Sequence, residues 1–457
     1  MRITIRFVAV FIMLAALSSS AAAQGVTATV SGTIKDAQGA TVPGATVTLV
    51  SESRGTTLAS VVSNSEGDFV IPNITADTYT LQVAMPSFKV LKRTGLQVSA
   101  GARIALGAVT IEVGPRTEEV VVRGETPIVQ AASGEKSYAI TTESVASLPL
   151  PGRGYEALLG LMPGVQVNLG GLTPASRLGG GGDSNFMLDG ATSMDPGVNR
   201  PATRVSVEAI SEVRVATSTY QAEYGRASGL QVNAVSKSGT NRFLGSVYDV
   251  ERDSKWNSNS QTNILNGDPK PFQDERDYGF SIGGPVGKPG GANKLFFFFT
   301  MEMQPRTVGG DVTRYRMPTL LERQGDFSQS TNNLGQPYPY IKDPSKTGAC
   351  NATSQAACFN DGGVVGKIPQ SALYAPGMAV LNWYPLPNLT NIPAGQTYNF
   401  ETTYPATKLL GFQPVIRLDY QPTSNLRGSF KFFEYQQPND PIQGILAGWN
   451  EIGRAHV

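Results

Sequence analysis

Residues able to do chemistry are scarce in this chain. Among 457 residues, His456 is the single histidine, and Cys350 and Cys358 are the two cysteines. A Ser-His-Asp triad needs a histidine and an HExxH zinc site needs two, so one histidine leaves both without support. The 36 acidic residues offer many carboxylate pairs, but no motif singles out one pair as a general acid and base. We therefore expect no enzyme activity, no catalytic residue, no cofactor and no metal.

Two further patterns resemble functional sites, but both are incomplete. The glycine run 179–182 resembles a phosphate cradle, but no Gly-Lys-Ser or Gly-Lys-Thr follows it, so we interpret it as a flexible loop. Cys350 and Cys358 lack a nearby histidine to complete a tetrahedral metal set. In an exported chain, their spacing predicts a disulfide that closes a small loop.

The N-terminus predicts export. Arg2 and Arg6 lie near the start, residues 7–17 form an unbroken apolar run, and Ala21-Ala22-Ala23 gives a small-residue cleavage pattern. We assign residues 1–23 to a secretory signal peptide; a retained membrane anchor is the alternative, but it needs about 20 apolar residues. The residue directly after the cleavage point is Gln24 rather than a cysteine, so no lipoprotein anchor is expected. No later apolar stretch reaches about 18 residues, so the exported form would be soluble, surface-attached or a β-barrel.

Composition excludes one class of partner and favours one class of fold. The net charge is +1, and no run of Lys or Arg follows the N-terminus, so we expect no nucleic-acid binding. The chain holds 50 glycines and 30 prolines, which are frequent at tight connections and depleted inside helices. We therefore expect a mainly β protein with few helices.

Residues 25–113 are predicted to form a small β-sandwich, because short alternating segments recur between clusters of turn residues. The segments are Ala28–Lys35, Ala45–Ser51, Thr57–Val62, Phe69–Ile71, Tyr79–Ala84, Gln97–Ser99 and Ile104–Val113. The positions Gly32, Asp36, Gly39, Pro43-Gly44-Ala45, Gly67 and Phe69 resemble those of the carboxypeptidase regulatory-like domain. This resemblance implies a transthyretin-like sandwich, also classed with carbohydrate-binding-like folds, without peptidase activity. Sugar binding follows by analogy alone; a periplasmic spacer or docking module is the alternative.

Residues 114–237 are predicted to be a linker followed by an α+β domain. The linker contains Glu118, Glu119, Val120, Val121 and Val122, a β-prone segment. This segment either pairs edge to edge with a partner strand or is the first strand of the α+β domain. The following domain should contain a short helix at Tyr155–Leu161 and strands at Phe186–Leu188 and Ile210–Val215.

Residues 238–450 alternate in the manner of strands that cross a bilayer at a tilt. Tyr278, Phe280 and Ile282 give one face apolar side chains, while the residues between them are small or polar. Leu295–Met303 is apolar on almost both faces, and residues 416–435 read as a hairpin with a short turn. The segment between Gln304 and Phe412 is too long for an ordinary connection, so we expect it to be functional or disordered and, in a barrel, extracellular.

Motifs at the border between these two regions carry a family resemblance. Tyr224-Gly225, Gly229 and residues 232–241 resemble the end of a plug domain entering the barrel of a TonB-dependent outer-membrane receptor. Phe243-Leu244-Gly245 and Tyr278–Pro285 resemble the Oar-like branch of that family. The resemblance covers most of residues 25–435 and implies a linker with a possible TonB box and a plug at residues 114–237, and a partial transmembrane β-barrel at 238–450.

The resemblance also implies partners. A TonB-type energy-transducing protein would bind residues 118–122 as a TonB box, and plug-loop residues Arg177, Asp183 and Asn185 would face the ligand. The ligand itself is open between a siderophore, a glycan, a peptide and a protein. The protein would lie in the outer membrane of a Gram-negative-type bacterium, in contact with its lipid, with the sandwich in the periplasm. The alternative is a cell-surface β-protein for adhesion or export, whose sandwich binds carbohydrate.

The C-terminal part predicts a truncated fragment. Barrels of this family have about 22 strands, and the sequence offers about five. Residues 451–457, EIGRAHV, resemble a translated sequencing adapter.

Overall fold

The computed structural model describes residues 27–115, 118–123, 135–141, 153–163, 165–167, 174–176, 184–195, 200–218, 229–332, 334–390, 396–404 and 406–436. The predicted signal peptide and residues 451–457 lie outside this set. The chain divides into two compact units. The first is Met1–Asp249, Asp277–Met303 and Phe412–Gln436, and the second is Val250–Arg276, Gln304–Gly411 and Gln437–Val457.

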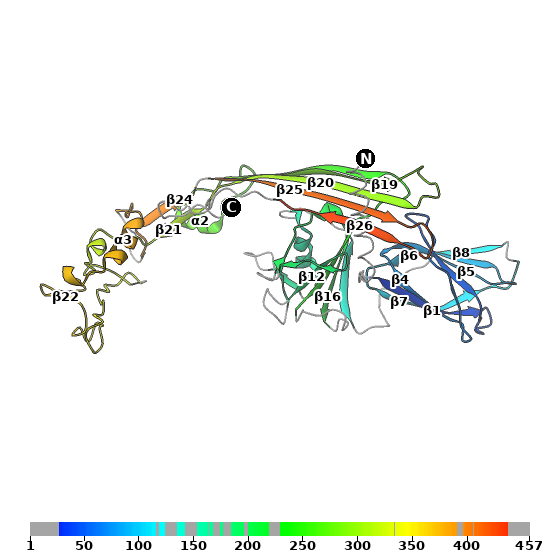
Figure 1. Cartoon of the computed structure of the whole chain (residues 1–457), viewed down its shortest axis with the longest axis horizontal. Coiled ribbons are helices and arrows are strands. Elements are labelled where there is room, and N and C mark those ends of the chain that lie inside the picture. Colours follow the sequence, from blue (N-terminus) through cyan, green and yellow to red (C-terminus); the bar gives the residue numbers. More distant parts are fainter. Residues whose placement is uncertain are drawn as a thin grey trace, which may run out of the picture. The chain divides into compact units, whose positions relative to one another are not determined.

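The N-terminal part of the first unit is a β-sandwich (Figure 1). Its strands are β1 (Ala28–Asp36), β2 (Thr46–Ser51), β3 (Val61–Val62), β4 (Asp68–Ile74), β5 (Asp77–Ala84), β6 (Val90–Val98), β7 (Arg103–Ile111) and β8 (Glu119–Arg123). One sheet has the order β4-β1-β7 and the other β3-β2-β5-β6-β8. Alternating apolar side chains, among them Ile34, Leu49 and Leu81, are fully buried in one core. At Gly67 a Cβ would lie 2.7 Å from the Ile34 carbonyl oxygen, so this turn needs glycine.

Strand β8 extends the sandwich beyond the predicted limit at Val113. It pairs in parallel with β6, with Val90 opposite Glu119 and Thr94 opposite Arg123. The alternative that this segment is the first strand of the following domain is therefore wrong. Val120 packs against the sandwich core, so burial of its side chain favours the sandwich as the partner.

Residues 135–236, called the candidate plug below, form an α+β domain. Its elements are β9 (Lys136–Thr141), η3 (Tyr155–Leu161), β10 (Val165–Val167), β11 (Pro174–Ser176), β12 (Asn185–Leu188), β13 (Ala191–Thr192), β14 (Met194–Asp195), β15 (Arg200–Pro201), η4 (Val207–Ala209), β16 (Ile210–Ser218) and β17 (Gln231–Ser236). The sheet order is β13-β12-β17-β16-β9, and β10-β11 and β14-β15 are separate hairpins. Tyr155 and Leu159 from the 3-10 helix η3 pack with Phe186, Val213 and Val232 in a core separate from that of the sandwich.

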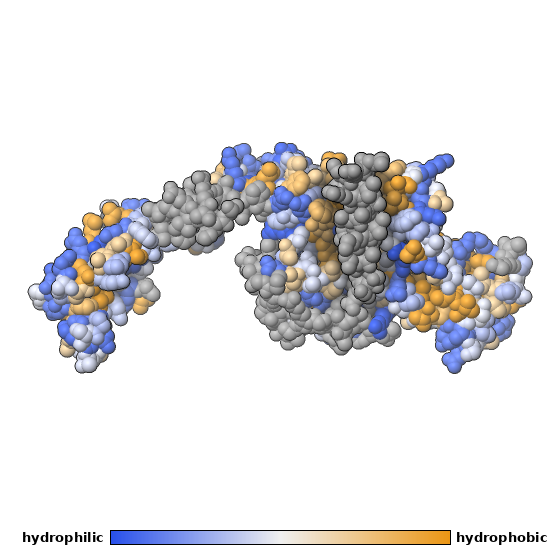
Figure 2. Space-filling model, in the orientation of Figure 1, coloured by the Kyte–Doolittle hydropathy of each residue, from blue (hydrophilic) through white to orange (hydrophobic). Residues whose placement is uncertain are grey.

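A five-stranded sheet, called the wall sheet below, follows in the order β18-β19-β20-β25-β26. The strands are β18 (Leu244–Asp253), β19 (Gln273–Pro285), β20 (Leu295–Val308), β25 (Thr407–Tyr420) and β26 (Gly428–Phe433), and the long strands are seen in Figure 1. Burial alternates along β20, where the buried row begins with Phe296 and Phe298 and ends with Thr300, Glu302 and Gln304. On the neighbouring strand β19, Phe280 and Ile282 are each 42% exposed. Hydrophobic residues also reach the described surface elsewhere, as the orange atoms of Figure 2 show.

The second unit contains the long segment predicted between Gln304 and Phe412. Its elements are α2 (Gln261–Asn266), β21 (Val312–Tyr315), η5 (Glu322–Gln324), β22 (Asn360–Asp361), β23 (Val364–Val365), η6 (Gln370–Ala372), α3 (Ala375–Trp383) and β24 (Phe400–Thr403). Strand β21 pairs with β24, and β22 pairs with β23. None of the helices in the described ranges is both long enough and apolar enough to cross a membrane.

Candidate functional site

The predicted TonB-box segment lies at the edge of the sandwich. Lys89 Nζ lies 3.1 Å from Glu118 Oε2, and Lys92 Nζ lies 2.7 Å from Glu119 Oε1. Both ion pairs are partly exposed, so solvent screens the attraction between their charges. The side chain of Val121 is 63% exposed. The segment is thus an ordered edge strand with an apolar outer side chain, held mainly by its backbone pairing with β6.

Of the three predicted plug-loop residues, only Asn185 lies in the part of the chain that the structure describes. Arg177 and Asp183 lie outside the described residues. Asn185 is not a loop residue, because it begins β12 and is 7% exposed. Its Nδ2 donates to Gln231 Oε1 at 3.1 Å, and its Oδ1 accepts from Thr192 Oγ1 at 3.4 Å. Asn185 therefore satisfies polar groups inside the candidate plug, and the prediction that it faces a ligand is wrong for this arrangement.

A buried acid on the wall sheet accepts hydrogen bonds from Ser206, Tyr248 and Arg153. Glu302 is fully buried on β20, and its Oε2 accepts from the Ser206 hydroxyl at 2.6 Å and the Tyr248 hydroxyl at 2.6 Å. Arg153 Nε donates to the same oxygen at 3.3 Å, and the Arg153 guanidinium lies 4.2 Å from the centre of the Tyr248 ring. Ser206 and Arg153 come from the candidate plug, and Tyr248 and Glu302 come from the wall sheet. These four residues, the Glu302 cluster, join the two parts.

Glu208 of the candidate plug continues this network. Its Oε1 accepts from Ser246 Oγ on β18 at 2.6 Å and from Lys237 Nζ at 3.3 Å, while Arg153 lies 3.7 Å from its other oxygen. Burial opposes ionisation of Glu208, but the hydroxyl of Ser246 and the two cations outweigh it and lower the pKa of this carboxyl. Glu208 therefore stays charged between its two cations at neutral pH.

A second polar contact lies around Asp189, in the turn after β12. Its two oxygens accept from the backbone N–H of Ser236 at 3.0 Å and the Ser236 hydroxyl at 2.6 Å. From the wall sheet, Lys431 Nζ lies 3.4 Å and Arg417 Nη1 lies 3.8 Å from this carboxylate. Arg417 also donates to both oxygens of Asp419 at 2.9 and 3.0 Å. Asp189 holds a positive φ of 51°, so the turn that presents its carboxylate is left-handed.

Apolar contact between the candidate plug and the wall sheet is less extensive than the polar contact described above. Val415 of β25 is 2% exposed in the candidate-plug core, and Phe433 packs partly against it. Hydrogen-bonded groups can exchange their partners for water at a small net cost, whereas separated apolar surface cannot. The described interface is therefore suited to a domain that is held in place but released without unfolding.

One buried acid of the candidate plug has a different character. Glu156 in η3 is 7% exposed, and its Oε2 lies 2.4 Å from the position of a Cβ at Gly154. Burial raises the pKa of Glu156 to about 7, against smaller opposing effects of its own backbone N–H and Arg204. A side chain at position 154 would shift this carboxyl from its place.

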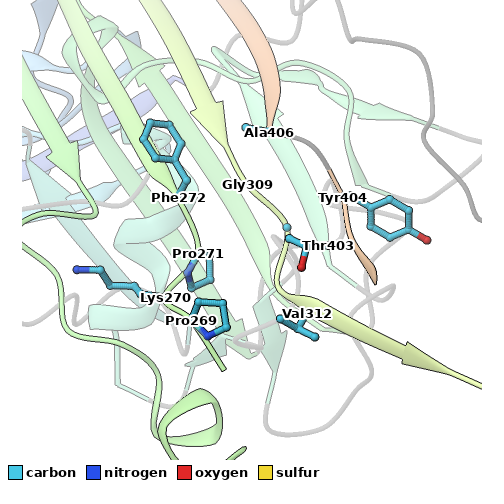
Figure 3. A pocket seen from close by; sticks show the side chains of 10 residues that line it. Pro269, Lys270, Pro271, Phe272, Gly309, Val312, Thr403, Tyr404 and Ala406 are labelled. Atoms are coloured by element: carbon cyan, nitrogen blue, oxygen red, sulfur yellow. The ribbon is translucent and has the colours of Figure 1, made fainter. Parts of the chain in front are cut away.

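The second unit contains a cavity of about 230 Å³, shown in Figure 3. Its lining is Pro269, Lys270, Pro271, Phe272, Gly309, Gly310, Val312, Thr403, Tyr404 and Ala406. Next to it, Arg314 Nη1 donates to Asp268 Oδ2 at 2.8 Å, and Arg314 Nη2 lies 3.0 Å from Glu401 Oε2. These ion pairs join the turn after α2 to β21 and β24, and they hold the walls of the mostly apolar cavity in place.

The cysteines lie in the same unit. Cys350 and Cys358 form a disulfide with a Cα–Cα distance of 5.0 Å. Within the described ranges, no group of three or more His, Cys, Asp or Glu side chains is arranged to hold a metal ion.

Sequence reasoning missed the residues that join the candidate plug to the wall sheet. Glu302 carried a signal, since an acid in the apolar run LFFFFTMEM is costly unless it has partners. Arg417 and Asp419 carried another, because residues two apart on a strand share a face. Asp189, Ser206 and Glu208 had no comparable signal, because their partners lie on distant strands.

Comparison with known proteins agrees with this architecture. Residues 29–112 match the model of the carboxypeptidase regulatory-like domain, and residues 235–456 match that of the outer membrane beta barrel domain. Among solved structures, the siderophore receptor PirA from Acinetobacter baumannii has a TM-score of 0.36 at 15% identity, covering 66% of this chain and 32% of its own. The outer membrane transporter YddB from Escherichia coli has a TM-score of 0.38 at 11% identity, covering 66% and 33%.

A curated relative supplies the family link. The TonB-dependent transporter Oar from Myxococcus xanthus is 27% identical over 332 residues, which are 65% of this chain and 29% of the relative. The chain thus spans about three tenths of the length of that relative. By these matches, the chain is a homologue of the TonB-dependent transporter Oar, with a carboxypeptidase regulatory-like domain followed by outer membrane beta barrel sequence.

Proposed function

We propose that this chain belongs to a TonB-dependent outer-membrane receptor that takes up a ligand through a plugged β-barrel. The observation that carries the proposal is the Glu302 cluster. It places a fully buried acid on the inward row of a barrel strand and satisfies it with Ser206 and Arg153 of a separate domain. A domain held against the barrel interior by such contacts is a gate that can be displaced. The relation to Oar supports the same reading.

The orientation follows from the short turn between β25 and β26. Short turns of outer-membrane barrels face the periplasm, and longer loops face outward. Gln421, at the start of this turn, donates from Nε2 to the Thr57 carbonyl oxygen of the sandwich at 3.0 Å. We therefore place the sandwich and β8 in the periplasm and the long segment of the second unit outside the cell.

In this scheme, ligand first contacts the long external segment, where the cavity next to Phe272 and Tyr404 offers apolar surface. A TonB-type protein pairs with β8 in the periplasm and draws on the energy of the inner membrane. The candidate plug then shifts and admits the ligand. The ligand class stays open between siderophore, glycan, peptide and protein, and no catalytic step is involved.

The test is photo-crosslinking of the full-length protein in living cells. A photoreactive amino acid at Val121 should crosslink to a TonB-type protein, and the adduct should vanish when that protein is deleted. Val62 is the matched control, because it is also 63% exposed but lies on β3, the other edge strand of the same sheet. Equal adducts from both positions, or none from Val121, would contradict the proposal. Adhesion that survives deletion of residues 118–122 would then favour the cell-surface alternative.

A further inference from the structure

Strand β8 is attached to the sandwich along its full length. Five consecutive residues pair in parallel with β6, and the Val90 N–H donates to the Glu118 carbonyl oxygen at 3.0 Å just before the strand. Val120 adds apolar contact with the sandwich core. A load on β8 is therefore carried first by β6.

Strand β6 leads directly to a contact with the candidate plug. The turn between β6 and β7, residues 99–102, places Ala100 at 1% exposure. The Ala100 carbonyl oxygen accepts from Arg214 Nη1 on β16 at 2.6 Å. Arg214 Nη2 donates to Glu135 Oε1 at 2.8 Å and to Ser137 Oγ at 3.0 Å, so the guanidinium is fixed from the plug side.

The face of β16 that carries this contact is polar but buried. Arg214 and Glu212 are each 7% exposed, while Val213 and Val215 are fully buried on the opposite face. Burial raises the pKa of Glu212, against the Ser99 hydroxyl, Arg214 and the Ala100 N–H. Both faces of the strand are thus covered, one by the candidate-plug core and the other by the sandwich turn.

The covalent connection between β8 and the candidate plug is long by comparison. Eleven residues, 124–134, separate Arg123 at the end of β8 from Glu135. A chain of that length extends to about 35–40 Å. That length is the upper limit on how far β8 could move before the chain alone pulled on the plug, and the turn contact is a second path between them.

We propose that the sandwich is a mechanical link, in which a pull on β8 reaches the candidate plug through β6 and the joint between Ala100 and Arg214. The link rests on the proposed function, since it assigns the domain that TonB would pull first. The sandwich then acts as a lever rather than as a spacer, and the joint sets how far β8 moves before the plug responds.

Force spectroscopy on the full-length protein in outer-membrane vesicles tests this link without ligand or TonB. Val121→Cys provides an exposed thiol for the pulling handle, because Cys350 and Cys358 are joined to each other. In this background, the first plug-unfolding event should follow at short extension. Arg214→Gln should delay it by up to about 35–40 Å, the fully extended length of residues 124–134.

Two further variants complete the test. Ala100→Phe changes the sandwich side of the joint, where the larger side chain should wedge the turn away from the candidate plug. It should give the same delay, and it covers the case in which Arg214→Gln fails to fold. Lys136→Gln, which removes an exposed charge on β9, should leave the extension unchanged. Equal extensions with and without the joint, or separation of β8 from β6 before any load reaches the plug, would overturn the link. A negative crosslinking result at Val121 would instead remove TonB as the source of the pull.

Discussion

The Ser206 hydroxyl donates to Glu302 Oε2 at 2.6 Å and joins the candidate plug to a fully buried acid of the wall sheet. Glu302→Leu would leave Ser206, Arg153 and Tyr248 without their shared acceptor. Removing one member of a buried charged network costs about 3–5 kcal/mol. We expect the candidate plug to become sensitive to trypsin at a clearly lower temperature. Glu66→Gln, at an exposed acid of the sandwich, should leave that temperature unchanged.

Ser206→Ala should have a smaller effect than Glu302→Leu. It removes one charge-assisted hydrogen bond, worth about 1.5–3 kcal/mol, and also the N-cap acceptor that the Ser206 hydroxyl gives the Glu208 N–H, but it leaves Tyr248 and Arg153 on the acid. The same protease assay should therefore place this variant between the parent and Glu302→Leu. A loss as large as that of Glu302→Leu would mean that the contact acts through Ser206 alone.

Two substitutions at Asp189 should separate the effect of its charge on stability from the effects of its other contacts and its backbone conformation. Asp189→Asn removes the charge facing Lys431 and Arg417, but asparagine accepts the positive φ of 51°. Asp189→Ala also removes the acceptors of the Ser236 N–H and hydroxyl, and it adds the strain of a left-handed alanine, about 1–2 kcal/mol. Chemical denaturation of the candidate plug should therefore rank alanine below asparagine. Equal stability of the two variants would show that the turn relaxes.

Glu156 predicts a pH dependence with a defined sign. Its pKa is about 7 when folded and 4.5 in the reference state, so the folded chain binds more protons between these values. Its contribution to the free energy of unfolding therefore falls as pH rises from about 4.5 to 7, by about 2–4 kcal/mol, and is constant above. Glu156→Gln should remove this slope in denaturation measured at pH 5 and pH 8. An unchanged slope would assign the dependence to other groups.

The disulfide should stabilise the long segment of the second unit locally. Closing an eight-residue separation contributes about 2–3 kcal/mol in the chain-entropy model. Lys346 Nζ donates to the Cys358 carbonyl oxygen at 3.3 Å, so loosening the loop should expose the neighbouring backbone. The double variant Cys350→Ser, Cys358→Ser should be cut faster by trypsin at Lys346. Cleavage in the candidate plug should not change.

Much of the fold was accessible from the sequence because local patterns determine it. Alternation and turn residues predicted the sandwich strands, the helix at Tyr155–Leu161 and the wall strands. The start of β6 was missed, since Lys92, Arg93 and Thr94 interrupt the apolar pattern. The assignment of β8 was open, because a short Val-rich strand does not encode which edge it joins.

The candidate site was much less accessible. Its contacts join residues up to about 240 positions apart, for example Ser246 with Glu208 and Lys431 with Asp189. Periodicity reports which face of an element is buried but not which distant side chain covers it. Arg214 shows this directly, since its alternation with Val213 and Val215 does not reveal that the sandwich turn covers its side chain.

The burial of Val415 in the candidate-plug core has a consequence for the order of assembly. This core includes Leu158 near its start and Val415 on β25, more than 250 positions later, so it stays incomplete until β25 joins it. Contacts this distant in sequence form late and slowly. Under the proposed export, the chain would expose Val213, Val232 and their neighbours to the periplasm during that interval, and a folding helper that covers apolar strands would be needed until the last contact closes.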